Sequence, residues 1–146
     1  MAYFVTGATG FIGRFVVANL LKRGDTVYIL VRAGSREKLA ALREFWNADD
    51  KKVVALTGDL AKPRLGLSDA DVRRLKGKVR HFFHLAAIYD LAANADDQLV
   101  ANVEGTRHAV ELAEAIAAGC FHHVSSIAAA GLYEGVFRED MFEEAE

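Results

Sequence analysis

The sequence has few of the residues that cross-link or interrupt a chain. Of its 146 residues, one is a cysteine and one is a proline. A single cysteine, Cys120, excludes an internal disulfide and agrees with a reducing compartment. The lone proline, Pro63, and the lack of Ser/Gly-rich tracts leave no sign of an internal linker. We therefore expect one domain.

The chain also lacks a long apolar run and an excess of charge of one sign. No run reaches the roughly 18 apolar residues that a membrane helix needs, and the first residues do not resemble a leader. With 18 Lys+Arg against 20 Asp+Glu, the net charge is -2. Such a balance gives no electrostatic case for nucleic acid or a membrane surface. We expect a cytoplasmic protein that binds a small-molecule substrate, and a homodimer remains open.

What the sequence does contain is a regular alternation of strand-like and helix-like segments. We expect strands at 3–6, 26–31, 53–57, 79–85 and 121–125. We expect helices at 11–23, 36–46 and 99–118, and a short helix opened by Ser68, Asp69 and Asp71. This alternation predicts an α/β fold of the Rossmann type, a doubly wound parallel sheet in the order 3-2-1-4-5. Ligands of such sheets bind at the carboxyl ends of the strands.

A glycine-rich turn, 6–13, joins the first expected strand to the first helix. Gly7 would allow the tight turn, Gly10 the approach of a pyrophosphate, and Gly13 close packing of helix on strand. The amides at the start of the helix would then face the phosphates. An ordinary glycine-rich turn is the alternative. The residues that we expect to contact a dinucleotide here are Thr6, Gly7, Thr9, Gly10, Phe11, Ile12 and Gly13.

The end of the second strand predicts which dinucleotide binds. An acidic residue there would favour NADH, but the sequence has Arg32, with Arg36 close by. A guanidinium presents a planar fork of donors to phosphate oxygens. We therefore expect the 2′-phosphate of NADPH to be preferred over NADH. A solvated strand-end charge is the alternative for Arg32.

The third and fourth strands end in further candidates. Asp59 could accept a hydrogen bond from the adenine amino group while Leu60 packs against the ring, although Asp59 could equally be a turn residue. We expect His84 to be a packed strand residue. The residues after it would leave room for the ribose and nicotinamide; they are Leu85, Ala86 and Ala87.

The turn reads T-G-x-x-G-x-x-G, which resembles the extended short-chain dehydrogenase/reductase superfamily. Residues 102–106 are similar to its N-V-x-G-T motif, and this implies that Asn102 supports the catalytic centre. The resemblance also places Ser126 at the catalytic serine, whose hydroxyl would stabilise charge on the substrate carbonyl oxygen. Val124 and Ser125 precede it and are counted with the cofactor-binding residues. Plain turn chemistry is the alternative for both serines.

A closer resemblance is to the fatty acyl-CoA reductase and thioester-reductase group. It is carried by residues 30–33, by 58–60 followed by 65–68, by 122–126 and by 135–140. It implies NADPH-dependent reduction of an acyl thioester or an aldehyde. A nucleotide-sugar or hydroxysteroid reductase or epimerase, and a non-catalytic NAD(P)-sensing module, remain alternatives.

The family's Tyr-x-x-x-Lys motif is not found in the sequence, because no tyrosine is followed by a lysine four residues later. We therefore expect residues 1–146 to be the N-terminal part of an NAD(P)-binding domain, with little or no activity alone. We expect no metal site. His122 and His123 are adjacent on a strand and so point to opposite faces, and no Cys/His spacing resembles a zinc site.

Overall fold

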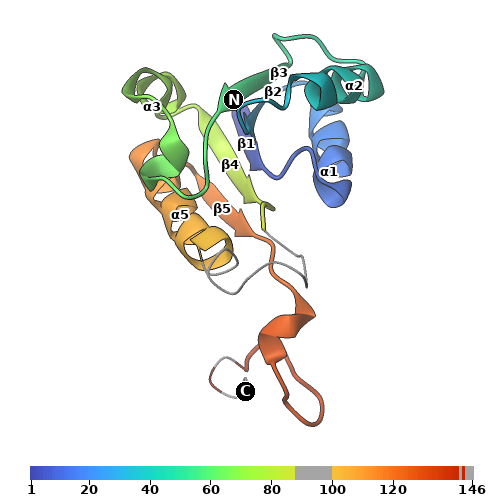
Figure 1. The fold of residues 1–146 in the computed structure, drawn as a ribbon, viewed down its shortest axis with the longest axis vertical. Helices are drawn as coiled ribbons and strands as arrows, with labels where there is room; N and C mark the ends of the chain where they lie inside the picture. Colours follow the sequence, from blue (N-terminus) through green and yellow to red (C-terminus); the bar gives the residue numbers. More distant parts are fainter. Residues whose placement is uncertain (88–99, 142, 144–146) are drawn as a thin grey trace.

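The computed structural model describes residues 1–87, 100–141 and 143, and its centre is one parallel sheet of five strands (Figure 1). The strands run in the order β3-β2-β1-β4-β5. Every neighbouring pair is parallel, which confirms the predicted doubly wound sheet. The strands are β1 (Ala2–Thr6), β2 (Thr26–Val31), β3 (Val53–Thr57), β4 (Val79–His84) and β5 (Cys120–His123).

Helices cover the two faces of the sheet in pairs (Figure 1). On one face lie α1 (Phe11–Leu21) and α2 (Arg36–Trp46), and on the other lie α3 (Asp69–Leu75) and α5 (Gly105–Ala115). Three short turns of helix complete the fold: η1 (Pro63–Gly66), the π-helical η2 (Val100–Glu104) and η3 (Ile127–Ala130). Within the described residues, none of the helices has the length and apolar character needed to span a bilayer.

The central strand β1 is buried along its whole length and divides the core into two halves. Phe4 belongs to the cluster under α3 and α5, whereas Tyr3 and Val5 belong to the cluster under α1 and α2. Side chains alternate between the faces of a strand, so a fully apolar strand supplies both halves. β1 therefore anchors both helical layers.

The apolar face of α1 differs in part from the predicted one, which contains Ile12, Phe15, Val16, Leu20 and Leu21: Leu20 is buried, and Val16 and Leu21 pack against the core. Its buried residues are Gly13, Val17 and Leu20. Ile12 and Phe15, which the predicted stripe contains, are 58% and 45% exposed. Gly13 has no side chain, so the helix axis comes closest to the sheet there and the residues one and two turns later are buried with it. Apolar spacing also predicts core positions for Phe45 on α2 and for Val103 and Val110 in the helix expected at 99–118, but each is exposed for more than a third of its area.

Several predicted ends are wrong by one to three residues. The last helix ends at Ala115 instead of 118, because Ala117 adopts a left-handed conformation (φ 51°). The N–H of Ala118 then donates to the carbonyl of Ala113 at 2.9 Å, which closes the helix. A glycine usually occupies this left-handed position. Because Ala117 stands there instead, the end of the helix was not predictable from the sequence. The predicted start at 99 lies outside the described residues, and β4 and β5 end at His84 and His123.

The short helix α3 begins as predicted. Ser68 is its N-cap, and its Oγ accepts a hydrogen bond from the N–H of Asp71 at 3.1 Å.

We predict that Gly13→Ala lowers the free energy of unfolding by about 1–3 kcal/mol. A Cβ on Gly13 would overlap the carbonyl oxygen of Gly7 and lie 2.8 Å from the Cα of Ala8. Urea unfolding measures the loss. Gly10→Ala is the matched control, since its Cβ would lie 3.2 Å from the same oxygen and should cost less. Equal losses in the two variants would contradict the close packing of α1.

Candidate functional site

The turn after β1 packs directly against the end of β4. Gly7 has φ +72°, and a Cβ there would lie 2.7 Å from the nitrogen of Ala86 and 2.8 Å from the carbonyl carbon of Leu85. Any side chain would be both strained and in collision with backbone. The N–H of Gly10 closes the turn by donating to the carbonyl of Gly7 at 3.0 Å. The first strand and its neighbour β4 are therefore joined backbone to backbone at their carboxyl ends.

The N-terminus of α1 starts from this turn and has no side-chain cap. Its N-cap, Gly10, has no side chain, and the first turn contains no acidic residue. The first amides of a helix carry partial positive charge and need an acceptor. Backbone amides at this position can therefore donate hydrogen bonds to a bound anion, and no capping side chain has to be displaced first.

A buried chain of hydrogen bonds runs across the carboxyl ends of β1 and β4. His84 is 1% exposed, and its Nδ1 lies 2.8 Å from Oγ1 of Thr6. Its Nε2 lies 3.2 Å from Oγ1 of Thr106, on α5. Thr6 Oγ1 also accepts from the N–H of Ala86 at 3.2 Å, and Thr106 Oγ1 donates to the carbonyl of Asn102 at 2.7 Å. One imidazole thus connects β1, β4 and α5.

The partners determine which ring nitrogen of His84 carries the proton. Thr106 uses its only hydroxyl hydrogen on Asn102, so it must accept from Nε2–H of His84. Nδ1 of His84 is then the acceptor for the hydroxyl of Thr6. Burial, and secondly the neighbouring His123, lowers the pKa of His84 from 6.5 to about 4. The imidazole is therefore neutral near pH 7, and its role is structural: it links β1 and α5 to β4 through hydrogen bonds.

The end of β3 forms a turn through Asp59. Its Oδ1 accepts from the N–H of Ala61 at 3.0 Å, and its own N–H donates to the carbonyl of Leu65 at 2.8 Å. Asp59 thus has the turn role that was the alternative in the sequence. Leu60 packs against the cluster under α3 and α5, and its carbonyl lies 2.8 Å from Nδ1 of His108. Their contacts with an adenine remain predictions.

The predicted basic residues lie at the start of the segment after β2. Arg32 follows β2 directly and is exposed, and its carbonyl accepts from the N–H of Ser35 at 3.2 Å. Arg36 begins α2, but its side chain lies outside the described part of the structure. The position of Arg32 at a carboxyl strand end agrees with the predicted location of the adenosine ribose.

The two predicted catalytic residues lie beyond the ends of the sheet. Asn102 is half-buried in η2, and its carbonyl belongs to the His84 network. Ser126 is exposed and caps η3, where its Oγ accepts from the N–H of Ala128 at 3.2 Å. Figure 1 shows the segment containing η3 extending away from the carboxyl end of β5. Val124 and Ser125 connect β5 to Ser126. The N–H of Val124 donates to the carbonyl of His84 at 3.0 Å.

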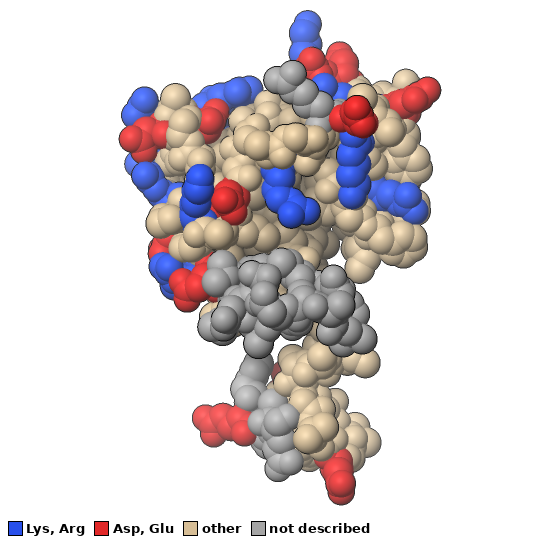
Figure 2. All heavy atoms as spheres, viewed as in Figure 1, with Lys and Arg blue, Asp and Glu red and all other residues tan. Residues whose placement is uncertain are grey.

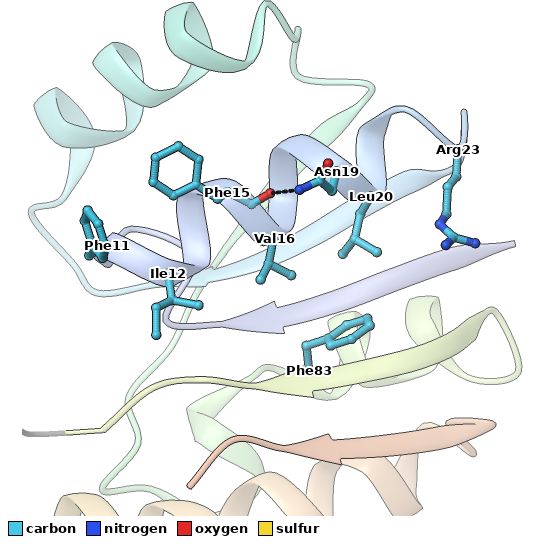
Figure 3. Close-up of a pocket in the computed structure, with 8 residues that line it drawn as sticks. All are labelled: Phe11, Ile12, Phe15, Val16, Asn19, Leu20, Arg23 and Phe83. Carbon is cyan, nitrogen blue, oxygen red and sulfur yellow. Dashed lines mark hydrogen bonds between the residues drawn. The ribbon is translucent and has the colours of Figure 1, made fainter. Parts of the chain in front are cut away.

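The structure also contains a groove that the sequence did not predict. It has a volume of about 370 Å³ and runs along α1 between this helix and β4 (Figure 3). It is distinct from the strand ends and shares with the predicted dinucleotide contacts only Phe11 and Ile12. The lining residues are Phe11, Ile12, Phe15, Val16, Asn19, Leu20, Arg23 and Phe83.

The exposed phenylalanines of α1 and α2 surround an arginine. The guanidinium of Arg14 lies 5.2, 4.8 and 5.9 Å from the ring centres of Phe11, Phe15 and Phe45. Such cation–π contacts hold the rings at the surface without burying them. On the face shown in Figure 2, charged side chains of both signs are interspersed, in keeping with the balanced net charge of -2.

A parallel sheet in this order, with a glycine turn leading into α1 beside β4, defines a nucleotide-binding domain of the Rossmann type. The chain belongs to the family described as male sterility protein, whose sequence model matches residues 5–146.

Relatives and solved structures agree with this assignment. The chain is 38% identical to a linear gramicidin synthase of Brevibacillus parabrevis, over 96% of the chain and 3% of that protein. It is 32% identical to fatty acyl-CoA reductase 1 of Mus musculus, over 84% of the chain and 27% of that protein. The terminal R domain of the myxalamid PKS-NRPS pathway matches with a TM-score of 0.79 and 28% identity, over 96% of the chain and 38% of the domain. The resemblance to the fatty acyl-CoA and thioester reductase group is thereby confirmed, and the chain spans a minor part of each.

We predict that His84 makes the protein less stable in acid. The unfolded chain protonates this imidazole below about pH 6.5, whereas the folded chain does so only near pH 4. The unfolded state therefore binds more protons in this window, and stability that is present above pH 6.5 is lost as the pH falls to 4. The loss amounts to roughly 2–3 kcal/mol. Urea unfolding at a series of pH values measures it.

Two variants test the cause of this pH dependence. His84→Gln should show a much smaller change in stability between pH 6.5 and pH 4 than the parent protein. His123→Gln should keep most of the change, because burial is the larger cause and His123 the smaller. If the His84→Gln variant retains the whole change, the buried imidazole is not responsible.

Proposed function

We propose that this chain binds NADPH and forms the cofactor-binding part of a reductase that acts on an acyl thioester or aldehyde carbonyl. The observation that carries the proposal is the turn at Gly7, which packs on Ala86. It presents the uncapped start of α1 at the carboxyl ends of β1 and β4, a place called the β1–β4 junction below. In a sheet of this order that junction is where nucleotides bind.

The residues at this junction fit a pyrophosphate. The turn has no side chain at Gly7 or Gly10, so backbone amides can approach phosphate oxygens directly. No side chain of the first turn competes, since α1 begins without an acidic residue. The nicotinamide supplies a hydride when bound; the chain's part is to hold the dinucleotide in one orientation.

The preference for NADPH rests on Arg32. Its exposed side chain follows β2, where the ribose of the adenosine half is expected. Asp59 and Leu60, after β3, are proposed to contact the adenine, and the residues after β4, from Leu85 to Ala87, to border the nicotinamide ribose. A 2′-phosphate beside Arg32 would gain charge-assisted hydrogen bonds that NADH cannot form.

The substrate class is supported by the names of the relatives and by the geometry of Ser126. A fatty acyl-CoA reductase and an R domain are among the proteins that the chain resembles. Ser126 Oγ accepts a hydrogen bond from Ala128, which leaves its own hydrogen for a carbonyl oxygen. Reduction adds a hydride to the carbonyl carbon, and the hydroxyl would stabilise the negative charge that develops on the oxygen.

We predict that Arg32→Ala weakens NADPH binding roughly 10- to 100-fold, because hydrogen bonds to charged groups contribute about 1.5–3 kcal/mol. Binding of NADH should stay within about twofold. Isothermal titration calorimetry of both dinucleotides at low salt measures the difference. Arg73→Ala, an exposed arginine on α3, is the matched control and should bind NADPH as the parent does. Equal affinities of the parent for NADH and NADPH would refute the preference.

We predict that Ser126→Ala lowers NADPH-dependent reduction of an acyl-CoA by roughly 10²- to 10³-fold in the whole protein that carries this chain. NADPH affinity should not change, because the serine is proposed to act on the substrate. Thr26→Ala, which removes a hydroxyl at the amino end of β2, is the matched control and should retain most of the activity. Unchanged turnover in Ser126→Ala would assign this hydroxyl to capping η3 alone. NADPH binding with no reduction by the parent would favour a non-catalytic sensor.

A further inference from the structure

Two histidines and the cysteine meet on one face of the sheet, away from the β1–β4 junction. His81 on β4 is in register with Cys120 on β5, and His122 follows two residues later. Residues two apart on a strand point to the same face, so Cys120 and His122 both face the side that carries His81. We propose that His81, Cys120 and His122 form a binding site for Zn²⁺. This proposal does not depend on the proposed reductase function.

The three ligand atoms lie close enough together for side-chain movement alone to form a tetrahedral site. One ligand atom from each residue lies within 4.8 Å of the others, and Nδ1 of His81 is 2.9 Å from Nε2 of His122. Zn–N bonds of about 2.0–2.1 Å at tetrahedral angles place two nitrogens about 3.3 Å apart, with sulfur about 2.3 Å from the metal. The two rings need to separate by a few tenths of an ångström, and the sulfur of Cys120, which lies within 4.8 Å of the nitrogens, needs to come to about 3.6 Å from each.

The ion would take the place of the hydrogen now shared by the two rings. On binding, that hydrogen moves to the other nitrogen of its own neutral ring, and the thiol of Cys120 releases its proton as it coordinates. The site then has two neutral imidazoles and one thiolate. Arg23 and Arg80 bring positive charge near His81, and the thiolate offsets part of their repulsion.

Aromatic neighbours hold both imidazoles in orientation. The ring of His122 is stacked on Phe83, with centres 4.5 Å apart and planes at 10°. The ring of His81 is stacked on Tyr3 at 6.0 Å. Ligands whose rotamers are already restricted lose less entropy on binding a metal. The ring pair is therefore organised before the ion arrives.

The donor set favours zinc over the hard cations. Mg²⁺ and Ca²⁺ prefer carboxylate and carbonyl oxygens, whereas imidazole and thiolate suit Zn²⁺. Three protein ligands leave a fourth position for water or another ligand. Since Cys120 and His122 lie on β5 and His81 on β4, the ion would bind β5 to its neighbour.

Co²⁺ and Zn²⁺ added to the reduced protein test the site. Co²⁺ should bind with a thiolate-to-metal charge-transfer absorption, and Zn²⁺ should displace it at one ion per chain. Cys120→Ser should abolish that absorption; Cys120 is exposed, so this change should not disturb the fold. His81→Gln and His122→Gln should each weaken Zn²⁺ binding by more than about 100-fold, since outer-shell partners alone contribute 10–100-fold.

His123→Gln is the matched control, because His123 lies on the same strand but outside the cluster. It should bind Co²⁺ and Zn²⁺ as the parent does, and circular dichroism should show that all variants are folded. The proposal is overturned if the parent shows no charge-transfer absorption, or if Cys120→Ser retains it. It is also overturned if folded His81→Gln and His122→Gln bind Zn²⁺ as tightly as the parent, or if one ion is bound by two chains.

Discussion

The hydrogen-bond chain through the neutral imidazole of His84 is the interaction on which the arrangement of the site depends. It satisfies the side-chain hydroxyls of Thr6 and Thr106, both ring nitrogens and the N–H of Ala86. An unsatisfied buried polar group costs about 1–3 kcal/mol, so breaking one link affects the others. These hydrogen bonds thereby fix the end of β1, the end of β4 and the start of α5 relative to one another.

Gly7 serves the same junction through steric contact. The backbone of its turn touches the backbone after β4, and the N–H of Ala86 reaches back to Thr6 beside it. Packing and hydrogen bonding therefore converge on the few residues that follow β4. The adjacent start of α1 keeps its amides free of a side-chain cap, which is the local condition for binding an anion.

The sheet and its order were predictable because the signals are local. Apolar β-branched runs, helix spacing and the cap at Ser68 each act within a few residues. The alternation of strands and helices predicts a parallel sheet, and the order 3-2-1-4-5 is the usual one for a sheet of the Rossmann type. The buried faces of the helices were less predictable. Apolar spacing predicts that Phe15 and Phe45 are core residues, but both are exposed and pack around Arg14. Cation–π contacts of this kind cannot be recognised from the spacing of apolar residues.

The turn at the candidate site was also predictable, since its glycines are contiguous with a strand and a helix. The network of His84 was not, because His84 and its two threonine partners are far apart in sequence and meet only once β1, β4 and α5 are packed. The same holds for the cluster of His81, Cys120 and His122, which depends on the register of β4 and β5. The expectation of no metal site rested on histidine spacing along one strand, whereas these side chains come from two.

The indole of Trp46 has a consequence for how motions of this domain can be observed. It is the only tryptophan in the sequence, it is 8% exposed, and its Nε1–H donates to the carbonyl of Arg14 at 2.8 Å. It therefore joins α2 to the helix that begins at the glycine turn. Intrinsic fluorescence excited at the indole would report separation of these two helices, and would respond little to opening around α5. The chain thus contains a built-in optical probe for the half of the fold in which the proposed nucleotide site begins.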